Sequence, residues 1–549
     1  MTSYGKKEED KVTKETGIIK GYLSTAEVKA QIEKLAPVRI DFDPSALTED
    51  EKQALQLIVQ TAHYMDKIFL EQVYHQNTAI LDELKKKTKP EYEVLLEYFK
   101  INFGPFDRLG YDRPFINLAE EKPKGANFYP ADMTKDEFEK WLQDHPQEEE
   151  DFTANFTLIR RKNGKLHAVP YSTAYKKYLE PASKLLKKAA RKTDNPSLKK
   201  YLNARADAFL SNDYLQSDMD WVDLKEHNIE VVIGPYEVYE DELFGYKAAF
   251  ECFITIVDRR ESEKLKAVAQ YIAEMEQNLP IADRYKTFDR GKSSPIVVVN
   301  EVFAAGDTKA GIQTTAFNLP NDERVRQQKG SKKVMLKNVA RAKFEKCWIP
   351  IVQEVLARSD SPYISFDSYF NHVLMHEVAH GLGPGIIKKQ GKQTTVNKEL
   401  KELYSTVEET KADIVGLWNL KLMIEKKVFP QDLKDKMYVT YLGGIFRCVR
   451  FGIDSAHGGG NAIQLDYIME KDGFRFDEQT GRFSVNREKI ESAVKQLAHD
   501  VLMIQALGDY NQAKAFIEKY RRISPELKRA LKAVEDVPVD IRPIYAVLD

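Results

Sequence analysis

The 549-residue chain is long enough to bury large hydrophobic cores and too long for one compact unit, so we expect two or more lobes. Its 83 basic and 85 acidic side chains nearly cancel, and it has no dense basic stripe with interleaved aromatic residues, which argues against nucleic acid as the main partner. The three cysteines are far apart and odd in number, which fits reduced thiols better than a disulfide framework.

The sequence has no segment that resembles a membrane span or an export signal. Nowhere do 18 apolar residues follow one another, and the opening Met1–Lys20 segment is charged and lacks an apolar core. We therefore expect a cytoplasmic monomer without a membrane span. The polar residues 6–10 leave a periplasmic or envelope-tethered location open, if they are a tether that remained after a targeting segment was removed.

Helical and strand patterns divide the chain. Apolar residues recur at helical spacing over residues 46–99 and 171–209, and again from Val339 almost to the end. Near Asn228 the pattern changes to short segments rich in β-branched and aromatic residues, which predict one small sheet or barrel. The predicted strands are 229–234, 249–257 and 295–303, with a helix at 264–278 between the second and the third.

Residues 376–380 read His-Glu-Val-Ala-His, an H-E-x-x-H motif. Histidines four residues apart on a helix project from one face, so both imidazoles can bind one metal ion while Glu377 reaches a water molecule on that ion. The composition makes only about 0.03 accidental matches expected. The alternative is a buried amphipathic helix with two structural histidines, and the motif favours a zinc hydrolase centre.

A third zinc ligand is expected downstream, because a catalytic zinc ion usually has three protein ligands, often two His and one Glu. A metzincin would have a third histidine six residues after His380, but Ile386 stands there, which excludes that class. We choose Glu409, with Glu408 as the second choice, because a well-packed helix follows this pair. The carboxylates considered in the next helix are Glu399, Glu402, Glu408 and Glu409.

Three further side chains are candidates for chemistry around the metal. Glu377 is the candidate general base, which takes a proton from water as it attacks a carbonyl and then protonates the leaving amine. Asp413, one turn beyond Glu409, can accept the second N–H of a ligating imidazole. His457 precedes three glycines, where we expect the helix to break and space to open for a substrate, and a simple turn residue is the alternative.

The two metal motifs together resemble the dipeptidyl peptidase III family of zinc exopeptidases, whose signature is a His-Glu helix followed by a Glu-Glu-x-x-Ala-acid helix. Residues 408–413 read Glu-Glu-Thr-Lys-Ala-Asp. The loops at 105–114 and 128–138 resemble a shorter bacterial and plant branch of that family. Other segments similar to the family follow in the same order, at 233–241, 250–253, 317–322 and 456–457.

The resemblance implies a role for each matching residue. It implies that His376, His380 and Glu409 bind one zinc ion per chain, that Glu377 is the base, and that Glu408 and Asp413 are acids behind the ligands. It also implies that Tyr239 and His457 steady the tetrahedral intermediate, and that Glu237, Asn318 and Asn321 hold the free amino end of a peptide, as carboxylate and amide oxygens can.

The chain departs from the best-known members of the family at two places. Those members have H-E-x-x-G-H, whereas the five-residue form here keeps i, i+4 geometry without a bulged helix. Three glycines follow His457, where a more regular helix is usual. These departures bear on peptide specificity and on catalytic rate.

We therefore expect a two-lobed, zincin-like α+β fold that releases dipeptides from the N-terminus of short peptides. Two alternatives stay open: a peptide-binding or scaffold protein that keeps the zinc site with little turnover, and a zinc hydrolase of a non-peptide amide. The presence of Glu377 favours the enzyme, since a binding module needs no base beside the metal. The predicted domains are 1–258 (mixed lobe with substrate-binding strands), 259–294 (helical insertion packing with the zinc lobe), 295–338 (return to the strand lobe) and 339–549 (helical zinc-binding catalytic lobe).

Overall fold

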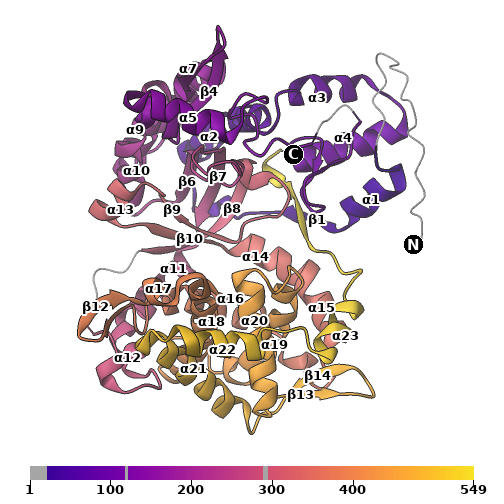
Figure 1. Ribbon diagram of the computed structural model, residues 1–549, viewed down its shortest axis with the longest axis vertical. Helices are drawn as coiled ribbons and strands as arrows, with labels where there is room; N and C mark the ends of the chain where they lie inside the picture. The colour runs from indigo at the N-terminus through magenta and orange to yellow at the C-terminus, as the bar shows by residue number, and fades with distance from the viewer. Residues whose placement is uncertain (1–21, 118–120, 289–294, 549) are drawn as a thin grey trace.

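The computed structural model describes residues 22–117, 121–288 and 295–548, so the Met1–Lys20 segment of the sequence analysis lies outside the described residues. The chain forms two lobes, one above the other in Figure 1. Each lobe has its own hydrophobic core. None of the described helices combines the length and the apolar composition that a membrane span needs.

The first lobe, uppermost in Figure 1, consists of a five-stranded sheet and the helices that pack around it. Its longest helix, α2, begins at a capping box in which Thr48 and Glu51 each bind the other's main-chain N–H. One side of α2 packs on the sheet strands β7 and β8. The helices of this lobe are α1 (Thr25–Glu33), α2 (Glu49–Val73), α3 (Asn77–Lys86), α4 (Pro90–Asn102), α5 (Lys135–Asp144), α6 (Glu149–Thr153), α7 (Tyr171–Ala174), α8 (Lys176–Ala190), α9 (Pro196–Ser211), α10 (Leu215–Val222) and α13 (Glu323–Lys329).

The strand order of the sheet is β6-β7-β8-β10-β9, and all three predicted strands belong to it. Strands β8 and β10 are parallel, and the other neighbours are antiparallel. Alternate residues of β10 pack into different cores, since Val334 and Leu336 belong to the first core and Met335 to the second. One sheet face therefore looks toward the second lobe. The strands are β6 (Ile229–Pro235), β7 (Phe250–Val257), β8 (Ile296–Gly306), β9 (Ala316–Leu319) and β10 (Lys332–Leu336).

The second lobe is mainly helical and is centred on α18, which packs against α16, α20 and α21. A π-helical segment, Phe344–Trp348, joins α14 to α15. Its helices are α11 (Arg259–Gln270), α12 (Ile272–Gln277), α14 (Lys337–Lys343), α15 (Ile349–Val355), α16 (Phe366–Ala379), α17 (Val396–Leu400), α18 (Tyr404–Glu425), α19 (Leu433–Val449), α20 (Ala456–Glu470), α21 (Ile490–Leu507), α22 (Tyr510–Tyr520) and α23 (Pro525–Ala533).

Short strand pairs lie outside the main sheet. After Val339, where the sequence predicts helices, the chain also forms the pairs β11–β12 and β13–β14 and the single strand β15. The last strand, β15, returns to the first lobe and pairs in parallel with β1. The predicted 339–549 domain therefore ends in a segment that packs on the other lobe. The pairs are β1 (Leu35–Ile40) with β15 (Asp540–Tyr545), β2 (Phe106–Asp107) with β3 (Arg113–Pro114), β4 (Thr157–Lys162) with β5 (Lys165–Pro170), β11 (Ile386–Lys389) with β12 (Lys392–Thr395), and β13 (Phe474–Asp477) with β14 (Arg482–Val485).

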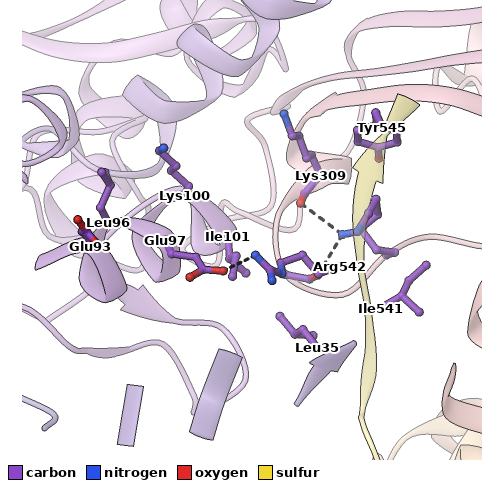
Figure 2. A pocket seen from close by; sticks show the side chains of 13 residues that line it. Leu35, Glu93, Leu96, Glu97, Lys100, Ile101, Lys309, Ile541, Arg542 and Tyr545 are labelled. Atoms are coloured by element: carbon purple, nitrogen blue, oxygen red, sulfur yellow. Dashed lines mark hydrogen bonds and ion pairs between the residues drawn. The ribbon is translucent and has the colours of Figure 1, made fainter. Parts of the chain in front are cut away.

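A cavity of about 410 Å³ lies in the first lobe, where β15 faces α4 (Figure 2). Arg542 on β15 forms an ion pair there with Glu97 on α4. Leu35, Ile101 and Tyr545 supply apolar walls. No lining residue of this cavity comes from the H-E-x-x-H or Glu-Glu motif, so the cavity is separate from the candidate metal centre.

Candidate metal centre

Helix α16 carries the H-E-x-x-H motif in its last turn. The helix begins after Ser365, whose hydroxyl accepts from the main-chain N–H of Ser368, and it ends at Ala379 with His380 as the C-cap. Gly383 then takes a left-handed backbone conformation with φ +79°, which directs the chain away from the helix axis. The helix therefore ends at the second histidine, close to the position that the following glycines predict.

Helix α18 crosses α16 at very close range because residue 416 is glycine. A Cβ atom at Gly416 would lie 2.8 Å from the main-chain nitrogen of His376 and 2.9 Å from the carbonyl carbon of Met375. Real Cβ atoms do not approach other atoms so closely. The crossing brings Glu408, Glu409 and Asp413 of α18 to the two histidines.

Three potential ligand atoms converge at this crossing. The Nε2 atoms of His376 and His380 are 3.1 Å apart, and Oε2 of Glu409 lies 3.4 Å from the first and 3.9 Å from the second. Tetrahedral ligands about 2.1 Å from a zinc ion are separated by about 3.4 Å, so this spacing suits one ion. Oε2 of Glu409 is buried without a hydrogen bond, as expected of an atom that has a cation for its partner.

The Nδ1 atom of each histidine is hydrogen-bonded to a carboxylate. His376 Nδ1 lies 2.7 Å from Oδ1 of Asp413, and His380 Nδ1 lies 2.8 Å from Oε1 of Glu408. Burial opposes ionisation of Glu408, but Lys411 and His380 lower its pKa to about 2, and His376 likewise holds the pKa of Asp413 below its usual value despite burial. These carboxylates accept from Nδ1–H, which leaves both Nε2 lone pairs for a metal.

Polar side chains that the sequence analysis did not identify hold the two acids in turn. Asn461 Nδ2 and Gln464 Nε2 donate to Oδ2 of Asp413 at 3.1 and 2.9 Å. Gln505 Nε2 donates to Oε2 of Glu408 at 2.8 Å. His457, Asn461 and Gln464 are spaced so that they lie on one face of a helix. This polar stripe is the signal in the sequence that could have identified Asn461 and Gln464.

Glu377, the candidate base, contacts the first lobe. Its Oε2 accepts from Nζ of Lys333 on β10 at 2.6 Å. Burial raises the pKa of Glu377, but Lys333 outweighs burial and the net pKa lies below the usual value. Glu377 is therefore a carboxylate able to take a proton. Lys333 is a further neighbour of the site that the sequence analysis did not identify.

His457 stands in a different setting from the predicted one. We expected a broken helix, but Ala456 begins α20, capped by Ser455, and the glycines form its first turn. They permit close packing, since a Cβ at Gly458 would lie 2.0 Å from the carbonyl oxygen of Gly452. The His457 side chain is 66% exposed, and its Nε2 lies 3.1 Å from Oε2 of Glu409, so it borders the ligand cluster.

The residues of the predicted amino-terminal clamp gather on the first lobe. Asn321 Nδ2 donates to Oε2 of Glu237 at 3.2 Å, and burial raises the pKa of Glu237. The Tyr239 side chain is exposed, and the negative charge of Glu237 raises the pKa of its hydroxyl group. Within the described residues, Tyr239 contacts Glu237 and none of the candidate metal ligands. Asn318 is exposed on the edge strand β9 and pairs in register with Lys333.

Comparison with known proteins places this geometry in a family. The model of peptidase family M49 matches residues 143–393. The solved structure of DPP III from Caldithrix abyssi superposes with a TM-score of 0.92 and 55% identity, covering 95% of this chain and 99% of that one. The chain belongs to peptidase family M49, the dipeptidyl peptidase III family.

Other relatives also match most of the chain. Dipeptidyl-peptidase III from Corallococcus sp. strain EGB superposes with a TM-score of 0.77 and 41% identity, over 95% of this chain and 97% of that one. "Nudix hydrolase 3" of Arabidopsis thaliana is 40% identical over 572 residues, which cover 94% of this chain and 74% of the plant protein. Its name describes the plant protein, part of which lies outside the alignment.

Membership confirms the predicted family, the two-lobed α+β fold and the class of enzyme, a metallopeptidase of the dipeptidyl-peptidase type. The roles of individual M49 site residues and the four domain ranges stay predictions.

Proposed function

We propose that the chain is a zinc-dependent exopeptidase that releases dipeptides from the N-terminus of short peptides. The observation that carries this proposal is the convergence of His376 Nε2, His380 Nε2 and Glu409 Oε2 within 4.8 Å of one another. Two imidazoles and one carboxylate are a common ligand set of catalytic zinc, and it leaves one position for water or substrate.

Zinc bound here would act as a Lewis acid and lower the pKa of its water. Glu377 would take a proton from the water molecule that attacks the scissile carbonyl, and the same carboxyl group would pass that proton to the leaving amine. The lowered pKa of Glu377 beside Lys333 keeps its carboxylate ionised, which supports its role in taking the proton from water. His457, at the edge of the cluster, is the group that we assign to the developing negative charge.

The amino-terminal clamp sets the length of the product. Glu237 offers a carboxylate, and Asn318 and Asn321 offer amide oxygens, to the ammonium end of an extended peptide. An extended chain advances about 3.3 Å per residue, so a clamp roughly 7 Å from the scissile carbonyl selects two residues. Membership of the dipeptidyl peptidase III family supports this number.

Metal analysis of matched variants tests the zinc proposal. We expect one zinc ion per wild-type chain, loss of zinc in His380→Ala, and full zinc in Glu377→Gln, because Glu377 is not a ligand. Turnover of Glu377→Gln should nevertheless fall about a hundredfold or more, since the water has lost its base.

Elemental analysis and steady-state kinetics give the two readouts. Full zinc occupancy in His380→Ala would contradict the ligand assignment. Wild-type turnover by zinc-loaded Glu377→Gln would contradict the assignment of the base. Zinc binding without turnover by the wild-type chain would instead favour the peptide-binding alternative.

A further inference from the structure

Two adjacent lysines of β10 point to opposite faces of the sheet. Lys332 is buried in the first lobe, where its Nζ lies 3.0 Å from both carboxylate oxygens of Glu230. Lys333 points to the second lobe and reaches Glu377 on α16, with Nζ 2.6 Å from Oε2 and 3.2 Å from the main-chain oxygen. The alternation of a strand explains why only the second lysine reaches the metal helix.

Lys333 also lies beside the proposed peptide-binding edge. Its direct partner across the antiparallel pair β9–β10 is Asn318, and directly opposed residues project from the same face of a sheet. Lys333 therefore stands between a residue of the amino-terminal clamp and the candidate base.

The contact between Lys333 and Glu377 is partly shielded from water. The exposed fractions of the two side chains are 19% and 23%. A short hydrogen bond between two charged groups in such surroundings fixes geometry better than an exposed ion pair does. Within the described residues, Lys333 is the hydrogen-bond donor of the Glu377 carboxylate.

We propose that Lys333 is a positioning residue that holds the carboxylate of Glu377 in its working orientation from the other lobe. The proposal rests on the proposed function, in which Glu377 is the base. Helix α16 supplies the base, and strand β10 of the other lobe orients it. The base is then fully placed only when the two lobes are together.

The test uses zinc-loaded Lys333→Met, Lys333→Arg and the control Lys329→Met. Methionine keeps the approximate length of the lysine side chain without its charge. The control substitution Lys329→Met removes an exposed ion pair with Asp223. We expect Lys333→Met to retain zinc and melting temperature, and to lose about tenfold in kcat with KM changed less than about twofold. Lys333→Arg should recover part of the loss, and the control should match wild type.

A double variant decides whether Lys333 acts through Glu377. In the Glu377→Gln background, Lys333→Met should cause no further fall in the residual kcat, because the group that it orients is already gone. A further tenfold fall would overturn the proposal, since Lys333 would then act on the substrate itself. So would a Lys333→Met variant with wild-type kcat, or one in which KM alone changes. Failure of the proposed function would show separately, as full turnover by Glu377→Gln alone.

Discussion

His376 and His380 each use one ring nitrogen for an acid and direct the other toward the same point. The acids, Asp413 and Glu408, are ionised in spite of burial and keep the proton on Nδ1. A metal ion at this point would therefore meet the two Nε2 atoms and Oε2 of Glu409, which already converge there. The orientation is built into the protein before the ion binds.

Removing the charge of one acid should weaken zinc binding without abolishing it. Glu408→Gln and Asp413→Asn should each lower the affinity for zinc about 10- to 100-fold, because the imidazole loses its tautomer control and its orientation. Competition with a chromophoric chelator measures the affinity. Glu402→Gln is the control, since Glu402 bonds to Tyr510 at the surface. Wild-type affinity in both variants would show that these acids do not orient the ligands.

The convergence of the candidate metal ligands can be predicted from the sequence because these residues follow local rules. Helical spacing places His376 and His380 on one face, and Glu409 and Asp413 lie one turn apart on a second helix. Lys333 could not be predicted in this way, since it reaches Glu377 only after a strand 44 residues earlier in the chain has been packed against the metal helix. No local pattern records that packing.

At the scale of the elements, the centre depends on how closely α18 approaches α16. The side chains that face each other belong to different helices, so a change in the distance between the helix axes moves the Glu-Glu motif away from the histidines. Gly416 sets that distance, because its hydrogen occupies the space where any other residue would place a Cβ atom.

Gly416→Ala should therefore reduce both stability and metal binding. We expect unfolding to cost about 1–3 kcal/mol less than in wild type, as for an overpacked core, and zinc affinity to fall. Chemical denaturation and the chelator assay measure the two effects. Gly444→Ala in α19 is the matched control, since the nearest atom to its added Cβ lies 3.7 Å away. An equal response of both variants would contradict a special role for the crossing.

Long elements are predictable and short ones are not. The helices α2, α18 and α21 and the strands β6, β7 and β8 are long enough for periodicity or composition to mark them. The hairpins β11–β12 and β13–β14 have strands of four residues, too short for a period to stand out within a helical region. The first turn of α20 was missed because three glycines normally oppose a helix, and here close packing against Gly452 requires them.

Over the whole molecule, the two lobes are tied together at more than one place. The last strand, β15, leaves the helical lobe and pairs with β1 in the first. At its start Asp540 binds the buried Lys343 of α14, with Nζ 2.9 Å from Oδ1, and accepts from the main-chain N–H of Gln313. This buried pair supports the joint between the lobes, and the ion pair of Lys333 with Glu377 is a second link between them.

The first lobe thus carries the proposed clamp for an ammonium group, and the second lobe carries the candidate metal centre. Asn318 and Lys333, neighbours on β9 and β10, connect the two in space. In the proposed function, a peptide that spans them would be held by its free amino end and cut at a bond chosen by the distance to the metal. An internal segment of a long protein has no such end, so endoproteolysis is not expected.

Mass spectrometry of the products from one hexapeptide, supplied with a free or an acetylated amino end, tests this function most directly. The zinc-loaded protein should release N-terminal dipeptides from the free peptide and leave the acetylated peptide uncut, because acetylation removes the charge that Glu237 recognises. Removal of zinc by a chelator should stop the release, and adding zinc back should restore it. Equally rapid cleavage of the acetylated peptide, or single amino acids as the main product, would contradict dipeptide release from a clamped amino end.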